Sequence, residues 1–278
     1  MTTTIDPSIA YIQAVQAWRD EQEASLRAED GWLTVVGLFW LHDGVNTVGS
    51  SPDSDVVLPS RLPPHLGLIT LHDGETQWRL TDEKFSVLVD GERRREAVLH
   101  HDARHPTLIQ VGGVTFFVIR RGERLAVRVR DTESEARRTF VGRQWFAVDP
   151  SYRVSARLER HASSRTIEVE TVLGTTVQYN SPGTVTFELA GAPYTLQAFE
   201  GATDSELWFV FRDATSGHST YGASRFLYAH ILEDGMVDLD FNRAKSPPCA
   251  FTPYATCPLP PRENILSIPI AAGEKHIG

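Results

Sequence analysis

The sequence predicts a mainly β protein, with an N-terminal helix, a β-sandwich, and then a second β-barrel or β-sandwich closed by a proline-rich loop. Helical spacing of apolar residues is confined to the first 27 positions. From Trp32 onward, short apolar runs alternate with turn signals such as Asp73-Gly74, Asp90-Gly91 and Gly112-Gly113. Strands between regularly spaced turns are typical of sandwiches and barrels rather than βαβ units.

The N-terminal segment is expected to form an amphipathic helix over Pro7–Arg27. Asp6 is a suitable N-cap, and Pro7 fits the first helical position, where its missing N–H is not needed. Apolar side chains recur at three- to four-residue spacing at Ile9, Ile12, Val15 and Trp18. This spacing predicts one buried face, while the charged residues beside it are expected to face solvent.

The remaining chain divides into two β-rich blocks. Residues 114–119 and 125–130 flank an Arg-Gly-Glu turn and predict a hairpin, and the charged residues 131–143 predict a crossing segment. The second block contains alternating or apolar runs that predict strands over residues 152–158, 165–170, 184–189, 194–199 and 207–211. We therefore expect three parts: a helix in 1–30, a sandwich in 31–135 and a barrel or sandwich in 136–278.

Composition narrows the classes of function. The chain has 278 residues, 41% of them hydrophobic, and a formal charge of −9. A net negative charge gives no general attraction for phosphate backbones or anionic lipid, so neither nucleic acid nor membrane is an expected partner. The sequence contains neither a secretory signal nor an apolar run of membrane-spanning length, which predicts a cytoplasmic protein, and it is compatible with a homo-oligomer.

Residues from about 44 to 130 resemble a forkhead-associated domain. Residues 48–58 resemble that family's first glycine turn and following strand, residues 60–65 its Ser-Arg-x-His stretch, and residues 78–80, 87–91 and 109–112 follow in the same order. Phosphothreonine binding in that family uses an arginine directly after the first glycine. Here that position is Ser50, and two additional residues separate Arg61 from His65.

The whole chain resembles the bacterial and archaeal family called domain of unknown function 1684. The resemblance is carried by residues 31–33, 37–41, 213–221, 225–226, 240–242, 247–251, 255–261, Asn264 and 272–274. It departs from the pattern at Lys245-Ser246, where Tyr-Asn is expected. The resemblance implies no established activity, but it joins these segments into one expected unit.

Asp238 and Asp240 are the first candidate residues for acid/base catalysis or cation binding. In a strand, both carboxylates would project from one face, where they could shift each other's pKa or bind a cation. The alternative is a solvent-facing stripe, with Val237 and Leu239 in the core.

Residues 213–221 contain Asp213, Thr215, Ser216 and His218, which are the residue types of a hydroxyl nucleophile with its base and orienting acid. No Gly-x-Ser-x-Gly elbow accompanies them, and a β-turn in which Asp213 and Thr215 bind local backbone is the favoured interpretation.

Cys249 and Cys257 could act as a nucleophile, a redox pair or two metal ligands, although two buried thiols filling space are favoured. A structural zinc needs four ligands and only His276 follows as an obvious third, so no metal is predicted. Residues 100–102 with His105 are a further metal-like cluster, which we interpret as an exposed loop.

These observations lead to one functional hypothesis and one alternative. The hypothesis is a C-terminal pocket for a small polar or anionic molecule, with hydrolase activity as a further step: Arg225 would anchor the anion and Asp240 would act as base or cation ligand. The other expected ligand-binding residues are Asp213, Thr215, Ser216, Tyr221, Asn242, Cys249, Tyr254, Cys257 and Asn264. The sequence requires no cofactor. The alternative is a non-enzymatic interaction module that uses the forkhead-associated-like domain.

Overall fold

The computed structural model describes residues 7–82, 84–101 and 104–276. The chain forms two compact units. The barrel unit comprises residues 1–25, 141–251 and 256–278, and the sandwich unit comprises residues 26–140 and 252–255. The N-terminal helix, which the sequence sets apart as its own segment, thus belongs over most of its length to the barrel unit.

Helix α1 spans Pro7–Arg27, which confirms the predicted helix and its bounds. The predicted N-cap Asp6 lies outside the described residues. Val15 is fully buried, whereas Ile9 and Ile12 are exposed, so the buried face is narrower than the apolar spacing predicts. Polar contacts from Tyr11 and Gln22 to Asp240 and Lys245 hold α1 against the outside of the barrel.

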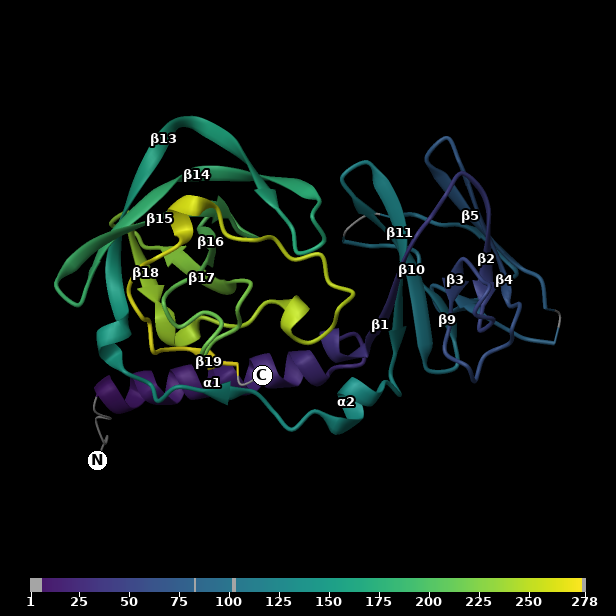
Figure 1. Ribbon diagram of the computed structural model, residues 1–278, viewed down its shortest axis with the longest axis horizontal. Coiled ribbons are helices and arrows are strands. Elements are labelled where there is room, and N and C mark those ends of the chain that lie inside the picture. The colour runs from purple at the N-terminus through teal and green to yellow at the C-terminus, as the bar shows by residue number, and fades with distance from the viewer. Residues whose placement is uncertain (1–6, 83, 102–103, 277–278) are drawn as a thin grey trace. The chain divides into compact units, whose positions relative to one another are not determined.

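The barrel unit is built on a closed, six-stranded antiparallel barrel (Figure 1). Its strands are β13 (Arg153–Glu170), β14 (Thr176–Leu189), β15 (Ala192–Glu200), β16 (Glu206–Phe211), β17 (Arg225–Ile231) and β18 (Met236–Asp240). Each strand pairs with the next, and β18 pairs back with β13, which closes the ring. The sequence left sandwich and barrel open for this region, and closure settles it as a barrel.

Strand β13 differs from the prediction. Two strands were expected over residues 152–158 and 165–170, but β13 is one strand of 18 residues. Its pairing with β14 shifts between Arg160 and Arg165, so a local irregularity interrupts the alternation within a continuous strand.

The proline-rich segment, taken as residues 247–264, is an ordered loop that backbone hydrogen bonds hold on the barrel outside residues 252–255, which belong to the sandwich unit. It contains the short 3₁₀ helices η4 (Pro248–Ala250) and η5 (Arg262–Asn264). Near it, η3 (Phe241–Arg243) follows β18, and β19 (Glu274–Lys275) pairs with β12 (Gln144–Trp145). Because the prolines cannot donate, the hydrogen bonds come from positions between them, such as Leu259 N to Glu170 O at 2.7 Å.

The sandwich unit packs two sheets around one apolar core. One sheet orders its strands β1-β11-β10-β9-β6-β7 and the other β3-β2-β4-β5-β8. The bounds are β1 (Val35–Trp40), β2 (Gly44–Gly49), β3 (Val56–Val57), β4 (Gly67–His72), β5 (Glu75–Leu80), β6 (Leu88–Val89), β7 (Glu92–Arg93), β8 (Glu96–Val98), β9 (Ile109–Val111), β10 (Val114–Arg121) and β11 (Arg124–Asp131). Strands β10 and β11 form the predicted hairpin.

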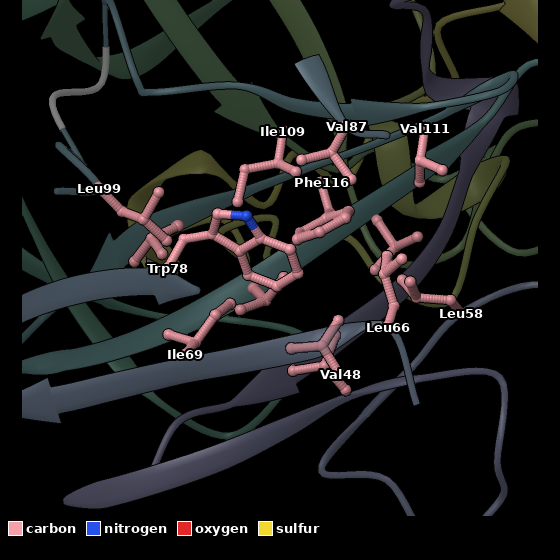
Figure 2. Packing of buried hydrophobic residues seen from close by; sticks show 14 of the residues in the cluster. Val48, Leu58, Leu66, Ile69, Trp78, Val87, Leu99, Ile109, Val111 and Phe116 are labelled. Atoms are coloured by element: carbon pink, nitrogen blue, oxygen red, sulfur yellow. The ribbon is translucent and has the colours of Figure 1, made fainter. Parts of the chain in front are cut away.

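The core of the sandwich is centred on Trp78 and Phe116, whose rings meet edge to face with centroids 5.4 Å apart. Aliphatic side chains from both sheets surround them (Figure 2). Two short helices flank the unit, η1 (Trp32–Thr34) and α2 (Glu135–Thr139), the latter in the predicted crossing segment. The mainly β fold with one N-terminal helix is therefore confirmed. No described helix is both long enough and apolar enough to cross a membrane.

Candidate functional site

The candidate site is a cleft of about 570 Å³ between α1 and the outer face of the barrel. Tyr11, Trp18 and Gln22 line it from α1. The barrel contributes side chains that alternate with core residues: Leu227 and Ala229 of β17 are buried, while Tyr228 and His230 between and beyond them are exposed. The remaining charged lining residues are Arg153, Glu206, Asp238, Asp240, Arg243 and Lys245.

Strand β18 places Asp238 and Asp240 on the same face, as the sequence predicts, with Val237 and Leu239 buried in the core. Both carboxylates line the cleft, and both have cationic partners. Arg153 donates to the two oxygens of Asp238 at 2.8 and 2.7 Å. Asp240 has a longer ion pair, with Arg243 Nε at 3.4 Å.

Asp240 is the centre of a hydrogen-bond network that fixes α1 to the barrel. Its Oδ1 accepts from Tyr11 Oη at 2.9 Å and from Asn242 N at 3.0 Å. Asn242 is fully buried and donates through Nδ2 to Asp149 O at 2.8 Å. Burial and the neighbouring Asp240 charge both raise the pKa of Tyr11. Tyr11 therefore stays a neutral donor to the carboxylate at physiological pH.

Lys245 is the cation of the cleft that lacks an acidic partner. Its Nζ donates to the neutral amide oxygen of Gln22 at 2.6 Å and lies 5.3 Å from the ring centroid of Tyr228. No carboxylate of the described residues forms an ion pair with it. Burial, reinforced by the charge of Arg143, lowers the pKa of Lys245 from 10.5 to about 8, while the charges of Glu274 and of Glu206, which also lines the cleft, oppose this shift.

Arg225, the predicted anion anchor, is only 1% exposed and does not line the cleft. Its Nη1 donates to Asp213 Oδ2 at 2.7 Å and to Ile270 O at 3.1 Å, and its Nη2 donates to Ala272 O. Asp240 has Arg243 rather than Arg225 as its counter-ion. Gly273 has a positive φ of 77°, and a Cβ there would clash with backbone carbonyls beside Arg225. Arg225 thus joins the C-terminal segment to the barrel interior.

Residues 213–216 form the local turn that the sequence favours over a catalytic triad. Asp213 Oδ1 accepts from Thr215 N at 2.7 Å and from Thr215 Oγ1 at 2.5 Å. Ser216 Oγ accepts from Asp213 N at 3.2 Å. Asp213, Thr215 and Ser216 are all buried, so this turn orients the carboxylate toward Arg225.

The remaining predicted polar residues are distributed over several places. Asn264 is fully buried, accepting from Gln197 N at 2.6 Å and donating to Val210 O at 2.8 Å, so it attaches the proline-rich segment to β15 and β16. Tyr254 belongs to the sandwich unit and is 36% exposed. Of Arg225, Asp240 and Tyr254, which the sequence predicts in one pocket, only Asp240 lines the cleft.

Cys249 and Cys257 lie together beside Tyr221 as thiols rather than as a disulfide. Cys249 N donates to Cys257 Sγ at 3.3 Å, and Tyr221 Oη donates to Cys249 O at 3.0 Å. Hydrogen bonding with Cys257, and to a smaller extent with Tyr221, lowers the pKa of Cys249 to about 7 against the opposing effect of burial. None of the three lines the cleft.

The described residues contain no group of three His, Cys, Asp or Glu that could hold a metal ion. Of the metal-like cluster at residues 100–105, Asp102 lies outside the described residues. In the sandwich unit, Ser50 Oγ donates to Leu62 O at 2.7 Å. Arg61 forms a bidentate ion pair with Asp131 at 2.7 and 2.6 Å, so this arginine already has a carboxylate partner.

Sequence reasoning missed Lys245, Tyr11 and Gln22 as site residues. Lys245 was visible as the departure from the family pattern, and its position two residues after η3 placed it near the Asp240 segment. Tyr11 and Gln22 lie 11 residues apart on a helix interpreted as packing only, and no sequence signal linked that helix to β18.

Fold and site together define a two-unit, mainly β protein whose closed barrel carries an external polar cleft covered on one side by a helix. Residues 138–275 match the family model described as "Protein of unknown function (DUF1684)", and the chain belongs to this family. The match contains the whole barrel and Lys245, whereas α1 lies outside it.

Solved structures similar to this chain include an uncharacterized protein of Haloarcula marismortui, which is 38% identical over 50% of this chain and 79% of its own, with a TM-score of 0.43. A forkhead-associated domain from a study of phosphothreonine-dependent interactions is 17% identical over 35% of this chain and 96% of its own. The FHA-2 domain of a Mycobacterium tuberculosis ABC transporter is 24% identical over 32% and 77%. Both have TM-scores of 0.25. No curated protein matches the chain.

Proposed function

We propose that the cleft between α1 and the barrel binds a small polar molecule that carries an anionic group. The observation that carries the proposal is Lys245, a partly buried ammonium group whose hydrogen-bond partner is a neutral amide. Placing a cation in a partly desolvated site is unfavourable unless an opposite charge compensates for it. An anionic ligand group beside Lys245 would supply that charge.

The rest of the cleft supports a polar ligand of modest size. Its volume of about 570 Å³ falls within the range of small-molecule sites. Arg243, with a side chain 36% exposed and a long 3.4 Å contact to Asp240, is a second cation that a ligand can reach. Tyr228 and Trp18 add aromatic surface, and His230 adds a further polar group.

The proposal is restricted to binding. Asp238 and Asp240, the carboxylates expected to support hydrolysis, already accept hydrogen bonds or ion pairs from Arg153, Tyr11 and Arg243. Neither is presented to the cleft as a base without a partner, so their contribution is to orient the cations and α1.

Binding of small dicarboxylates such as succinate, measured by calorimetry or NMR titration, tests the proposal. We expect Lys245→Met to weaken binding at least about tenfold, because a charge-assisted hydrogen bond of about 1.5–3 kcal/mol is lost. Lys275→Met is the matched control, since Lys275 lies in the same unit but does not line the cleft. Equal losses in both variants, or no loss in Lys245→Met, would contradict the proposed site.

A further inference from the structure

A second polar groove, of about 360 Å³, lies on the sandwich unit, on the outer face of strands β10 and β11 of the six-stranded sheet. In β10, Phe116 and Val118 enter the core of the sandwich, whereas Phe117 and Ile119 point to the opposite face. These two side chains, with Leu108, give the groove an apolar floor. The groove is independent of the barrel cleft, because all its lining residues belong to the sandwich unit.

The walls of this groove are strongly basic. Five of its ten lining residues are arginines, Arg104, Arg120, Arg121, Arg128 and Arg130, and His101 is a sixth basic group. Arg120 Nη2 lies 3.2 Å from His101 Nε2. The protein as a whole has a formal charge of −9, so this concentration of positive charge is a local feature and opposes the overall electrostatic character.

Arg130 places its guanidinium charge against the aromatic ring of Phe117. Its guanidinium carbon lies 5.1 Å from the ring centroid of Phe117, and its Nε–H is buried with no acceptor among the described residues. Buried donors are normally paired, so the described part of the protein leaves the hydrogen-bonding capacity of Arg130 incompletely satisfied. The cation–π contact with Phe117 also holds the guanidinium group beside the apolar floor.

The charge of the groove indicates the kind of anion. A single carboxylate carries one negative charge, whereas a phosphate monoester carries nearly two at neutral pH and presents three acceptor oxygens to arginine forks. A long polyanion is disfavoured, because the groove is small and the net charge of the chain repels it. The aromatic and aliphatic floor suits a flat apolar group attached to the phosphate.

We infer that this arginine-lined groove on the outer face of β10 and β11 binds a phosphate monoester attached to a flat, largely apolar group. A mononucleotide carries a phosphate monoester together with the flat, apolar face of an aromatic base, and a groove of about 360 Å³ can hold it. A phosphorylated aromatic side chain of a protein presents the same chemistry from another source. The inferred site is separate from the residues 48–65 that resemble the forkhead-associated binding loops.

The test is a calorimetric titration of the full chain with AMP and with adenosine, in parallel with a phosphotyrosine peptide and its unphosphorylated form. The variants are Arg120→Ala, at an exposed position, and Arg130→Gln. Arg93→Ala is the matched control, because Arg93 is an exposed arginine of the same unit that does not line the groove. Urea unfolding of each variant separates a lost site from a lost fold.

We expect AMP to bind at least about tenfold more tightly than adenosine. The affinity for AMP should fall by about the same factor in Arg120→Ala and in Arg130→Gln, and should not change in Arg93→Ala. If the phosphotyrosine peptide binds more tightly than AMP with the same dependence on the variants, the phosphate chemistry is supported and a protein is its source. Equal binding of AMP and adenosine, or phosphate binding that survives both groove variants, overturns the inference. Loss of succinate binding in Lys245→Met has no bearing on this result, so the two proposals fail independently.

Discussion

Arg225 and Lys245 are neighbouring cations in the same barrel unit, yet their surroundings differ completely. The residue after Arg225 pairs with Lys245 through two backbone hydrogen bonds, Phe226 N to Lys245 O at 2.8 Å and Lys245 N to Phe226 O at 2.9 Å. Arg225 points inward to Asp213 and to carbonyls of the C-terminal segment. Lys245 points into the cleft, where Gln22 is its hydrogen-bond partner.

The difference separates a cation that holds the fold from one that is available to a ligand. A buried arginine that donates to a carboxylate and two carbonyl oxygens, as Arg225 does, has its charge compensated by the protein itself. A partly desolvated lysine with a neutral partner does not. The geometry of partners, rather than residue type or proximity to a carboxylate, therefore decides which cation to assign to binding.

The largest expected effect comes from breaking the buried pair. Arg225→Met leaves the Asp213 carboxylate buried without its cation, which should lower the free energy of unfolding by about 3–5 kcal/mol. Urea denaturation measures this loss. Adding Asp213→Leu in the same chain should restore part of it, because both buried charges are then absent. A stable Arg225→Met protein that has lost only carboxylate binding would reverse the roles assigned to Arg225 and Lys245.

A smaller loss is expected when the proline-rich segment is detached from the barrel. Asn264→Ala removes the side chain that pairs with the backbone of Gln197 and Val210, leaving buried groups unpaired at a cost of about 1–3 kcal/mol. Glu263→Ala, an exposed neighbour, is the control and should unfold like the wild type. Equal stability of the two variants would show that Asn264 does not hold the segment.

The affinity of the cleft for succinate should fall as pH rises above about 8. The pKa of Lys245, about 8 in the folded protein, lies below its ordinary value of 10.5, so the ammonium charge is lost within an accessible range. A bound carboxylate favours the protonated form, and affinity should fall by up to about tenfold per pH unit beyond that pKa. Calorimetry between pH 7 and 10 measures this change in affinity. An affinity for succinate that does not depend on pH in this range would exclude Lys245 as the residue that binds the carboxylate.

The lowered pKa of Lys245 also affects the free energy of unfolding, and its pH dependence has the opposite sign from that of a salt-bridged lysine, whose pKa is raised. Between pH 8 and 10.5 the unfolded chain binds more protons at Lys245 than the folded protein does. The contribution of Lys245 to the free energy of unfolding therefore rises with pH across this window. Subtracting the profile of Lys245→Met from that of the wild type isolates it, and a falling difference would contradict the lowered pKa.

The smallest effect is expected at the two cysteines, of which Cys249 is partly exposed and Cys257 is buried. Alkylation of Cys249 by iodoacetamide should follow an apparent pKa of about 7, since the thiolate is the reactive form. Cys257→Ser and Tyr221→Phe should raise that pKa, the former more. An alkylation pKa near 9 in the wild type would show that these contacts do not stabilise the thiolate.

The fold was largely predictable because its signals are local. Periodicity predicts α1 over Pro7–Arg27, and turn residues around Gly122 predict the β10–β11 hairpin. Closure of the barrel was not predictable, since the pairing of β18 with β13 joins residues about 85 positions apart and no local pattern reports it. Likewise, the uninterrupted length of β13 was hidden by the irregularity between Arg160 and Arg165.

The candidate site was predictable only in part. Alternation along β18 places Asp238 and Asp240 on one face, and turn chemistry assigns Asp213 to local backbone. The partner of Arg225 could not be chosen, because Asp213 and Asp240 both lie at or just after the end of a predicted strand and only the folded barrel determines which of them meets Arg225. The contribution of α1 depends on tertiary packing, so Tyr11 and Gln22 carry no sequence signal.

The most direct test of the distinction between Arg225 and Lys245 is an NMR titration of the lysine side chains. The chain has only three lysines, so ¹³C-labelled lysine gives three Cε signals, and Lys245→Met assigns the one that matters. We predict that this signal titrates near pH 8 in the free protein and at a higher pH when succinate is bound. Titration near 10.5, unchanged by succinate, would show that Lys245 is an ordinary surface lysine and would contradict the proposed cleft.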